Sequence, residues 1–426
     1  MPNTRMSRRT LLAATPAATL AAEAAGTPRR PRIAAVVTEY RKYSHAQNIV
    51  DRFLEGYGWD GAHHRPAMDV VSLYVDQLRD SDLSRERAAR FPGMRLYPTI
   101  AGALTQGGDQ LAVDGVLLIG EHGEYPRNDR GQTLYPRYEF FRAITDVFRR
   151  SGRTAPVFND KHLSWKWEWA KEMADTAQQL GFGFMAGSSL PVTWRIPSLD
   201  LPWGAEVVEA FALGPGGPDS YDFHALEAAQ CLLERRRGGE TGVRHIQARR
   251  GPAAWQALEA PSWAAGGCDP ELLQACLCRS FMLKPLREGF SHALPDEKQL
   301  RDLEKNPVLY RYEHRDGVRV TMMLAEALVQ DITVAVRVRG EAAPFSLQMY
   351  LGAGHQMQPN FFNPLVRHVE TLFETGASPI PIGRTLLTTG LVAAGIESLA
   401  RGEVRVETPH LDIRYRAPRR SLFRQS

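Results

Sequence analysis

Residues 113–164 read VDGVLLIGEHGEYPRNDRGQTLYPRYEFFRAITDVFRRSGRTAPVFNDKHLS, and this stretch decides the fold. Its first apolar run, at 116–119, ends at Gly120 and is typical of a strand buried on both faces of a parallel sheet. An amphipathic helical pattern follows, and a second apolar run at 155–158 leads into the ionisable segment 160–162 (DKH). Two successive strands therefore end in ionisable side chains. In an open α/β sheet, ligands bind beyond this end of the strands.

Composition restricts the classes of function. The chain has 426 residues, with 52 Lys and Arg against 48 Asp and Glu and a formal net charge of +4. This balance, without a basic stripe interleaved with aromatic residues, argues against nucleic acid as a partner. The length predicts two or three domains. The four cysteines lack the spacing of a zinc site or a CxxC redox pair, and we expect free thiols at Cys231, Cys268, Cys276 and Cys278.

The first 26 residues have the pattern of an export signal. Arg8-Arg9 precedes a stretch rich in Ala and Leu, and residues 22–24 offer a small-x-small cleavage site. The stretch is too short and too rich in alanine to be a good membrane span. We therefore expect twin-arginine export to the periplasm or the extracellular space, with no membrane contact after the signal is removed. A disordered basic start on a cytoplasmic protein is the alternative.

Strand and helix patterns alternate over residues 31–190, which predicts a Rossmann-like, doubly wound parallel sheet. Ser44 suits the N-cap of the first helix. Residues 56–66 read as a polar loop, and Asp76 follows the second strand. Three Trp residues in the helix at 165–180 cannot share one face, so we expect one or two to pack on the sheet. The expected strands are 33–37, 68–75, 116–119, 155–158 and 184–187.

The pattern of strand and helix segments changes after residue 190, and residues 191–418 predict an α+β domain built on an open antiparallel sheet. A strong helical pattern at 222–237 is ended by Gly238-Gly239. Residues 252–295 are interrupted by Gly and Pro and give no clear prediction. The expected strands are 207–213, 243–248, 308–312, 318–323, 332–338 and 346–351, and the later helices are 364–373 and 385–400.

The order of these segments resembles the Gfo/Idh/MocA family of NAD(P)-dependent sugar and polyol dehydrogenases. The similarity covers most of the mature chain at low identity. Residues 113–116 (VDGV) resemble a strand motif of the family, and 160–162 (DKH) stand where the family has Glu-Lys-Pro. Residues 222–224 (DFH) resemble its helix bearing Asp and His. The resemblance implies a catalytic crevice between the two domains and a homo-oligomer, often formed through the second sheet.

The resemblance also implies roles for individual residues. Lys161 would orient a sugar hydroxyl, and His224, with Asp222 beside it, would remove the hydroxyl proton as hydride leaves for the nicotinamide. Asp76 would contact the ribose hydroxyls of the cofactor, which favours NAD over NADP. The small-molecule substrate would be a carbohydrate or polyol. The expected cofactor-binding residues are Thr38, Ser44, His45, Asp76, Gly120, Glu121 and His122, and the expected substrate contacts are Tyr125, His162 and Glu227.

The chain departs from the family after the first strand. Residues 38–45 read TEYRKYSH, so bulky side chains replace the glycines of G-x-G-x-x-G that let a backbone approach a pyrophosphate. Residues 121–125 (EHGEY) replace the family's nicotinamide-side segment. Two alternatives therefore stay open: a non-redox lyase, isomerase or hydrolase, with or without a metal ion, and a non-catalytic exported carbohydrate-binding protein. The ligand-type residues at the predicted strand ends are Glu39, His45, Glu121, His122, Asp160, His162 and His224.

Overall fold

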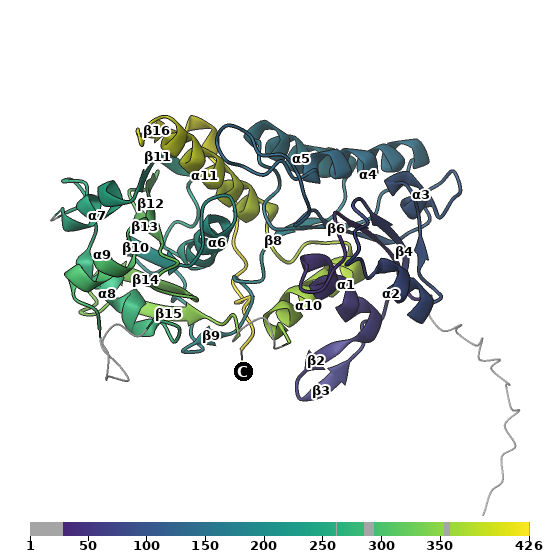
Figure 1. The fold of residues 1–426 in the computed structure, drawn as a ribbon, viewed down its shortest axis with the longest axis horizontal. Coiled ribbons are helices and arrows are strands. Elements are labelled where there is room, and N and C mark those ends of the chain that lie inside the picture. Colours follow the sequence, from purple (N-terminus) through teal and green to yellow (C-terminus); the bar gives the residue numbers. More distant parts are fainter. Residues whose placement is uncertain (1–28, 261, 285–293, 353–357, 426) are drawn as a thin grey trace, which may run out of the picture. The chain divides into compact units, whose positions relative to one another are not determined.

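The computed structural model describes residues 29–260, 262–284, 294–352 and 358–425. Residues 31–426 form one compact unit. The predicted export signal lies outside the described residues. Within these ranges, no helix combines the length and the apolar character that a membrane span needs. Figure 1 labels the helices and strands in chain order.

Six parallel strands form the first sheet, in the order β5-β4-β1-β6-β7-β8. This confirms the predicted doubly wound sheet, and the strand order reverses at β1, as it does at the ligand-binding switch point of such folds. The central strand is buried on both faces, because Ile33 packs toward one layer of helices and Ala34 toward the other. The strands are β1 (Arg32–Val37), β4 (Asp69–Val75), β5 (Arg95–Leu96), β6 (Gly115–Ile119), β7 (Val157–Asp160) and β8 (Phe184–Gly187).

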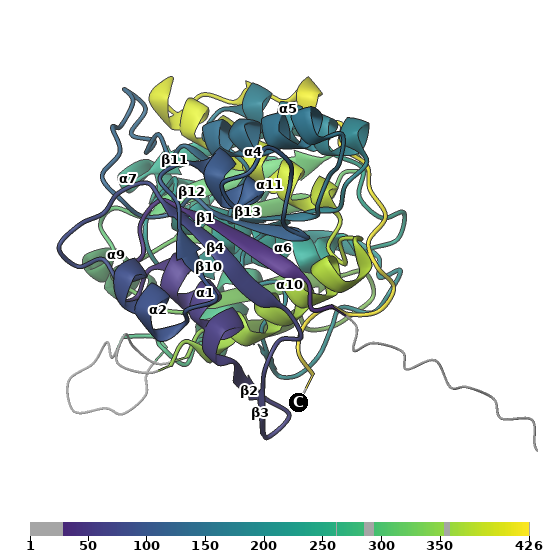
Figure 2. The ribbon, with the colours of Figure 1, turned by 90° about the vertical axis from the view of Figure 1, so that its right-hand side faces the viewer.

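Helices cover both faces of this sheet (Figures 1 and 2). Helices α1 and α10 pack on the face of Ile33, and α3, α4 and α5 pack on the opposite face. Helix α10 follows the second sheet in the sequence, so it completes the first core from beyond the boundary expected at Leu190. That boundary stays a prediction. The helices are α1 (His45–Glu55), α2 (Ser84–Arg90), α3 (Ile100–Thr105), α4 (Arg137–Ser151), α5 (Trp167–Leu180) and α10 (Asn363–Thr375).

Eight strands form the second sheet, in the order β16-β11-β12-β13-β10-β14-β15-β9. The pairs are antiparallel except for β10 with β13, which confirms the predicted α+β architecture. The strands are β9 (Arg195–Ile196), β10 (Val207–Gly214), β11 (Val243–Arg250), β12 (Val308–His314), β13 (Arg319–Leu324), β14 (Ile332–Val338), β15 (Phe345–Met349) and β16 (Val406–Glu407).

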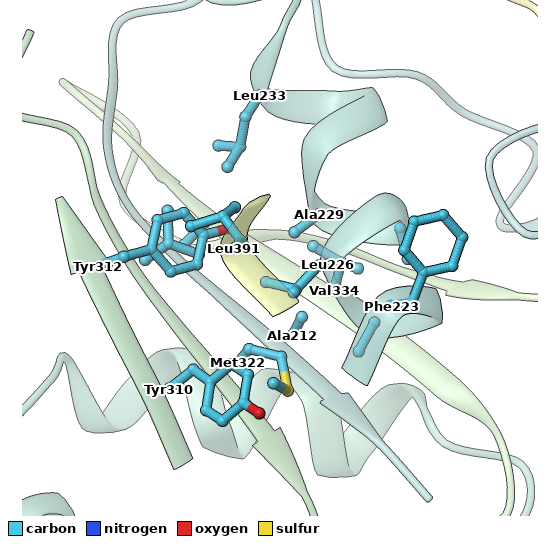
Figure 3. Close-up of a cluster of buried hydrophobic side chains, with 14 of the residues drawn as sticks. Ala212, Phe223, Leu226, Ala229, Leu233, Tyr310, Tyr312, Met322, Val334 and Leu391 are labelled. Atoms are coloured by element: carbon cyan, nitrogen blue, oxygen red, sulfur yellow. The ribbon is translucent and has the colours of Figure 1, made fainter. Parts of the chain in front are cut away.

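Both faces of the second sheet are also covered. Helices α6 and α11 pack on one face, and Figure 3 shows Leu226 and Leu233 of α6 in the same cluster as Tyr310 and Tyr312 of β12. Helices α7 and α8 cover the other face within the same chain. The homo-oligomer stays a prediction. The helices are α6 (Tyr221–Leu233), α7 (Pro252–Glu259), α8 (Pro270–Arg279), α9 (Glu297–Leu303) and α11 (Ile382–Ala400), with 3-10 turns at Asn360–Phe362 and Pro409–Leu411.

The segment expected as a polar loop at 56–66 is instead a hairpin of β2 (Tyr57–Trp59) and β3 (Ala62–His64). Asp60 and Gly61 have φ values of 51° and 74°, and Asp-Gly with two positive φ angles is the signature of a type I′ hairpin turn. Elsewhere some expected bounds shift: the helix expected at 222–237 is α6 (Tyr221–Leu233), and the strand expected at 155–158 is β7 (Val157–Asp160). The four cysteines are free, with three of them buried. Trp169 stacks on Tyr138 with ring centroids 4.6 Å apart.

Candidate functional site

A cavity of about 380 Å³ lies where the carboxyl end of β7 meets the first turns of α1 and α6. Three histidines line it, so we name it the histidine cavity: His45 begins α1, His122 follows β6, and His224 lies in the first turn of α6. A larger hollow of about 620 Å³ lies among α7, α8 and α9, away from this group of ionisable side chains. The remaining lining includes Tyr43, Asn48, Asp160, Ser188, Ser189, Tyr221, Met282, Gln330, Ile332, Phe361 and Phe362.

His45 and Asp160 form a dyad in the cavity wall. Ser44 caps α1 by accepting a hydrogen bond from the Gln47 amide at 3.1 Å, which places His45 at the first helical position. The His45 Nδ1 atom lies 2.7 Å from Asp160 Oδ2, and the two side chains are 17% and 1% exposed. The other carboxylate oxygen, Asp160 Oδ1, is buried without a hydrogen-bond partner among the described residues. The carboxylate therefore orients the imidazole and retains one free acceptor.

The other two histidines are held in the neutral state. Burial, followed by the electrostatic effect of the neighbouring His45 ring, lowers the pKa of His122 to about 3. Burial, followed by the electrostatic effects of Lys161 and His45, lowers the pKa of His224 well below its ordinary value. The rings of His45 and His122 meet edge to face, with centroids 5.1 Å apart. His224 Nδ1 is buried and lacks a hydrogen-bond partner in the described part of the chain. Neutral imidazoles in this arrangement can accept protons or hydrogen bonds from a bound molecule.

A buried ion-pair network lies close to the cavity. Glu121 accepts a hydrogen bond from Lys161 Nζ at 2.8 Å and pairs through its other oxygen with Arg137. Arg137 in turn contacts His162 Nε2 at 2.8 Å. Burial alone would raise the pKa of Glu121, but Lys161 and Arg137 hold it well below its usual range. The single carboxylate of Glu121 thus pairs with two basic side chains. The network fixes Lys161, whose φ of 63° is unusual for a residue other than glycine.

Of the two principal catalytic candidates, His224 lines the cavity and Lys161 is not among its lining residues, although the charge of Lys161 contributes to the lowered pKa of His224. Lys161 is only 5% exposed, and its ammonium group donates a hydrogen bond to Glu121. His162 is 3% exposed and contacts Arg137, so its expected contact with substrate is not seen.

Three further expectations need correction. Asp222 is fully buried and accepts hydrogen bonds from the Phe223 amide at 2.8 Å and the Tyr310 hydroxyl at 3.1 Å, so it stabilises the start of α6 instead of facing the cavity. Glu227 is 1% exposed and accepts a hydrogen bond from the Ser188 amide at 2.7 Å, beneath the cavity wall. Tyr125 binds Asp76 instead of lining the cavity.

Three residues expected to bind cofactor have structural roles. Thr38 is fully buried and donates a hydrogen bond to the carbonyl of Glu121 at 2.8 Å. Ser44 is the buried cap of α1. Gly120 lies against Arg137, since a Cβ at this position would be 2.6 Å from Arg137 Cγ. These residues shape the strand ends without presenting side chains to a ligand.

The sequence analysis named Asp160 only as a ligand-type residue of the alternative without redox chemistry, and it missed Ser188 and Ser189. The position of Asp160 directly after a buried strand was a usable signal, because it precedes Lys161 in the segment that resembles the family motif. The two serines also follow a strand, β8, but they are uncharged and gave no sequence signal for a site. Among the described residues, no group of three or more His, Cys, Asp or Glu side chains is arranged to hold a metal ion.

The loop after β1 does not fit a dinucleotide held as a glycine-rich loop holds it. Glu39, the second residue after β1, is 3% exposed and pairs with Arg41 at 2.6 Å. A buried carboxylate here opposes a pyrophosphate. The expected ribose ligand, Asp76, already accepts hydrogen bonds at both oxygens, from Tyr74 at 2.6 Å and Tyr125 at 2.7 Å. The strand order of a dinucleotide-binding sheet is therefore present, while its loops differ.

Comparisons with known proteins give structural matches only. Neither protein-family models nor curated proteins match this sequence. GenD2 from gentamicin A biosynthesis, solved with NAD, aligns over 89% of this chain and 96% of its own with a TM-score of 0.54 and 13% identity. Myo-inositol dehydrogenase from Lactobacillus casei, solved with NAD(H) and myo-inositol, aligns over 89% and 97% with a TM-score of 0.54 and 12% identity.

A third match is myo-inositol 2-dehydrogenase from Lactobacillus plantarum, with a TM-score of 0.52 and 10% identity over 89% of this chain and 99% of that one. In each case the alignment spans both sheets of the present chain. At these identities the likeness establishes architecture. The chain therefore has the two-sheet fold of the Gfo/Idh/MocA-type oxidoreductases.

Proposed function

We propose that this protein is an enzyme that transfers a proton to or from a hydroxyl-bearing small molecule in the histidine cavity. The observation that carries the proposal is the His45–Asp160 dyad at 2.7 Å in the same cavity as His224. A carboxylate that accepts the Nδ1 proton leaves Nε2 as the basic nitrogen of the imidazole. His45 then exchanges the proton, and neutral His224 hydrogen-bonds a second substrate group. Proton transfer by a positioned imidazole typically accelerates a reaction by about 10²–10⁴-fold.

The cavity favours an uncharged, polyhydroxylated substrate such as a carbohydrate or cyclitol. Its lining combines amide and hydroxyl side chains, such as Asn48 and Ser188, with aromatic faces such as Phe361. Asp160 is the charged side chain in the described lining, apart from the histidines, and its carboxylate disfavours an anionic substrate. The volume of about 380 Å³ lies within the range of small-molecule sites.

An NAD-dependent oxidoreductase acting on the same substrate class is the second candidate. It is supported by the strand order of the first sheet and by the NAD complexes among the similar structures. Here His224 would accept the hydroxyl proton, and Lys161 would lie beside it. The two candidates share the cavity and differ in whether turnover requires NAD.

The proton-transfer role is tested with His45→Gln and Asp160→Asn. A panel of neutral sugars and cyclitols is followed by NMR, with and without NAD, and the best substrate is then assayed with each variant. We expect kcat to fall by about 10²-fold or more in His45→Gln and by a smaller factor in Asp160→Asn, which retains an oxygen for Nδ1. His63→Gln, on the exposed hairpin, is the control. Wild-type turnover in both dyad variants would refute the role.

We also propose that residues 1–26 direct twin-arginine export and that the mature protein is a homo-oligomer. The twin arginine at Arg8-Arg9 supports the first proposal. Fractionation of cells that produce the full chain should place it outside the cytoplasm, and an Arg8→Lys, Arg9→Lys variant should remain inside. Light scattering of the mature protein measures the oligomer directly.

A further inference from the structure

We infer that the strand-end crevice of the first sheet is closed by the chain itself and does not take a dinucleotide. The closing segment is 120–125, which we name the bridge. In the sheet, β1 lies between β6 and β4. The bridge leaves the end of β6 and its far end is fixed beyond the end of β4, so it passes the end of β1. This is where a dinucleotide lies in a sheet of this strand order.

Four hydrogen bonds fix the far end of the bridge. The side chain of Gln77 pairs with the backbone of Glu124 in both directions, donating to its carbonyl at 3.0 Å and accepting from its amide at 2.9 Å. The Tyr125 hydroxyl donates to Asp76 at 2.7 Å, and Arg79 donates to the Glu124 carboxylate at 2.6 Å. The acidic residue that would receive a ribose is thus occupied by a side chain of the bridge.

The middle of the crevice holds charges that already balance. Arg79 pairs with Glu124 and also lies 3.6 Å from the buried carboxylate of Glu39. Arg41 pairs with the same carboxylate at 2.6 Å. A pyrophosphate would have to displace Glu124 and compete with Glu39 for these guanidinium groups. The loop after β1 also has a full-size, buried Tyr40 where a dinucleotide fold has glycine.

The near end of the bridge serves the histidine cavity. The Glu121 carbonyl accepts a hydrogen bond from Thr38, and its carboxylate joins the buried network with Lys161. His122 and Gly123 follow with φ values of 70° and 101°, a turn that brings the His122 ring to the cavity wall. The space that a nicotinamide cofactor would need has therefore become a wall of the substrate site. The consequence is a reaction that does not use a nicotinamide cofactor held in this crevice.

Dinucleotide binding tests this inference independently of activity. If the inference fails, the proposed proton transfer is therefore still undecided. The mature protein is purified, denatured in acid and analysed for NAD(H) and NADP(H). The native protein is titrated with NADH while nicotinamide fluorescence is recorded. We expect no released dinucleotide and no saturable binding up to millimolar NADH. Stoichiometric release of a dinucleotide, or saturable binding in the micromolar range, would overturn the inference and favour the oxidoreductase.

Hydrogen exchange tests the bridge itself. Amides in peptides covering 120–126 should be protected in the wild-type protein, and NADH should leave this protection unchanged. Gln77→Ala removes both hydrogen bonds to the Glu124 backbone and should raise exchange in the bridge by about tenfold or more. Gln178→Ala, on the exposed face of α5, is the matched control and should not. Rapid exchange in the wild type, or unchanged exchange in Gln77→Ala, would contradict a closed crevice.

Discussion

At the scale of single residues, Glu121 is the group on which the site's charge balance depends. Glu121→Gln leaves Lys161 and Arg137 buried without a counter-charge, and such a loss typically costs about 3–5 kcal/mol of unfolding free energy. Because the folded pKa of Glu121 lies below its unfolded value, its stabilisation is complete above the ordinary carboxyl range and is lost as the pH falls through the folded pKa. Urea denaturation at neutral and acidic pH measures both effects.

The matched control is Asp175→Asn, which removes the half-exposed pair of Asp175 with Lys171 on α5. Such a surface pair contributes about 0.3–0.5 kcal/mol. We expect Glu121→Gln to lose far more stability at neutral pH and to be less sensitive to acid than the wild type. Equal losses of unfolding free energy in the two variants would show that the Glu121 network does not contribute net stability.

Residue identities at strand ends could be predicted better than their roles. The sequence placed Asp160, Lys161 and His162 at one strand end, and they do lie there. It could not show that Asp160 faces the cavity while its neighbours turn inward, because that depends on the left-handed backbone at Lys161. The burial of Asp222 depends on Tyr310, a partner from a distant strand. Such long-range pairings leave no local pattern in a single sequence.

At the scale of elements, the start of α1 couples stability to the site. Ser44→Ala removes the cap of α1 and should cost about 1 kcal/mol. It should also lower turnover, because His45 is the first helical residue and its alignment with Asp160 depends on that turn. Thr99→Ala removes the equivalent cap of α3, where Thr99 accepts from the Gly102 amide at 3.0 Å, and should destabilise without reducing turnover. Denaturation curves and kcat are measured for both variants. Equal turnover in Ser44→Ala and Thr99→Ala would show that the cap of α1 does not affect catalysis.

Element prediction succeeded where burial imposes a simple pattern. Strand β1 is a continuous apolar run because both of its faces are covered, and Ser44 marked the start of α1. The β2–β3 hairpin was missed although Asp60-Gly61 signals its turn, since its three-residue strands are too short to show alternation. The helices α7 and α8 lie among Gly and Pro residues, and their helical form depends on packing, of α7 against β11 and of α8 against β10 and β14. Local propensity alone could not reveal them.

At the scale of the whole molecule, the chain returns to its first sheet through α10. Asn363 accepts a hydrogen bond from Arg52 at 2.7 Å and donates to the Gly58 carbonyl at 2.9 Å, while Glu370 contacts His64 at 2.8 Å. The apolar side chains that α10 adds to the first core are all nearly buried: Leu365, Val366, Val369, Leu372 and Phe373.

We therefore predict that residues 31–190 do not fold alone, although the sequence suggests that they are a domain. Burying five such side chains contributes about 10 kcal/mol, which is comparable to the whole stability of a typical domain. Circular dichroism should show a non-cooperative thermal transition for the fragment 31–190 and a cooperative one for 31–426. A cooperative transition in the fragment would contradict the prediction and show that the first sheet folds without α10. If the prediction holds, the histidine cavity forms only after the last third of the chain has folded, because the first sheet that carries His45 and Asp160 requires α10.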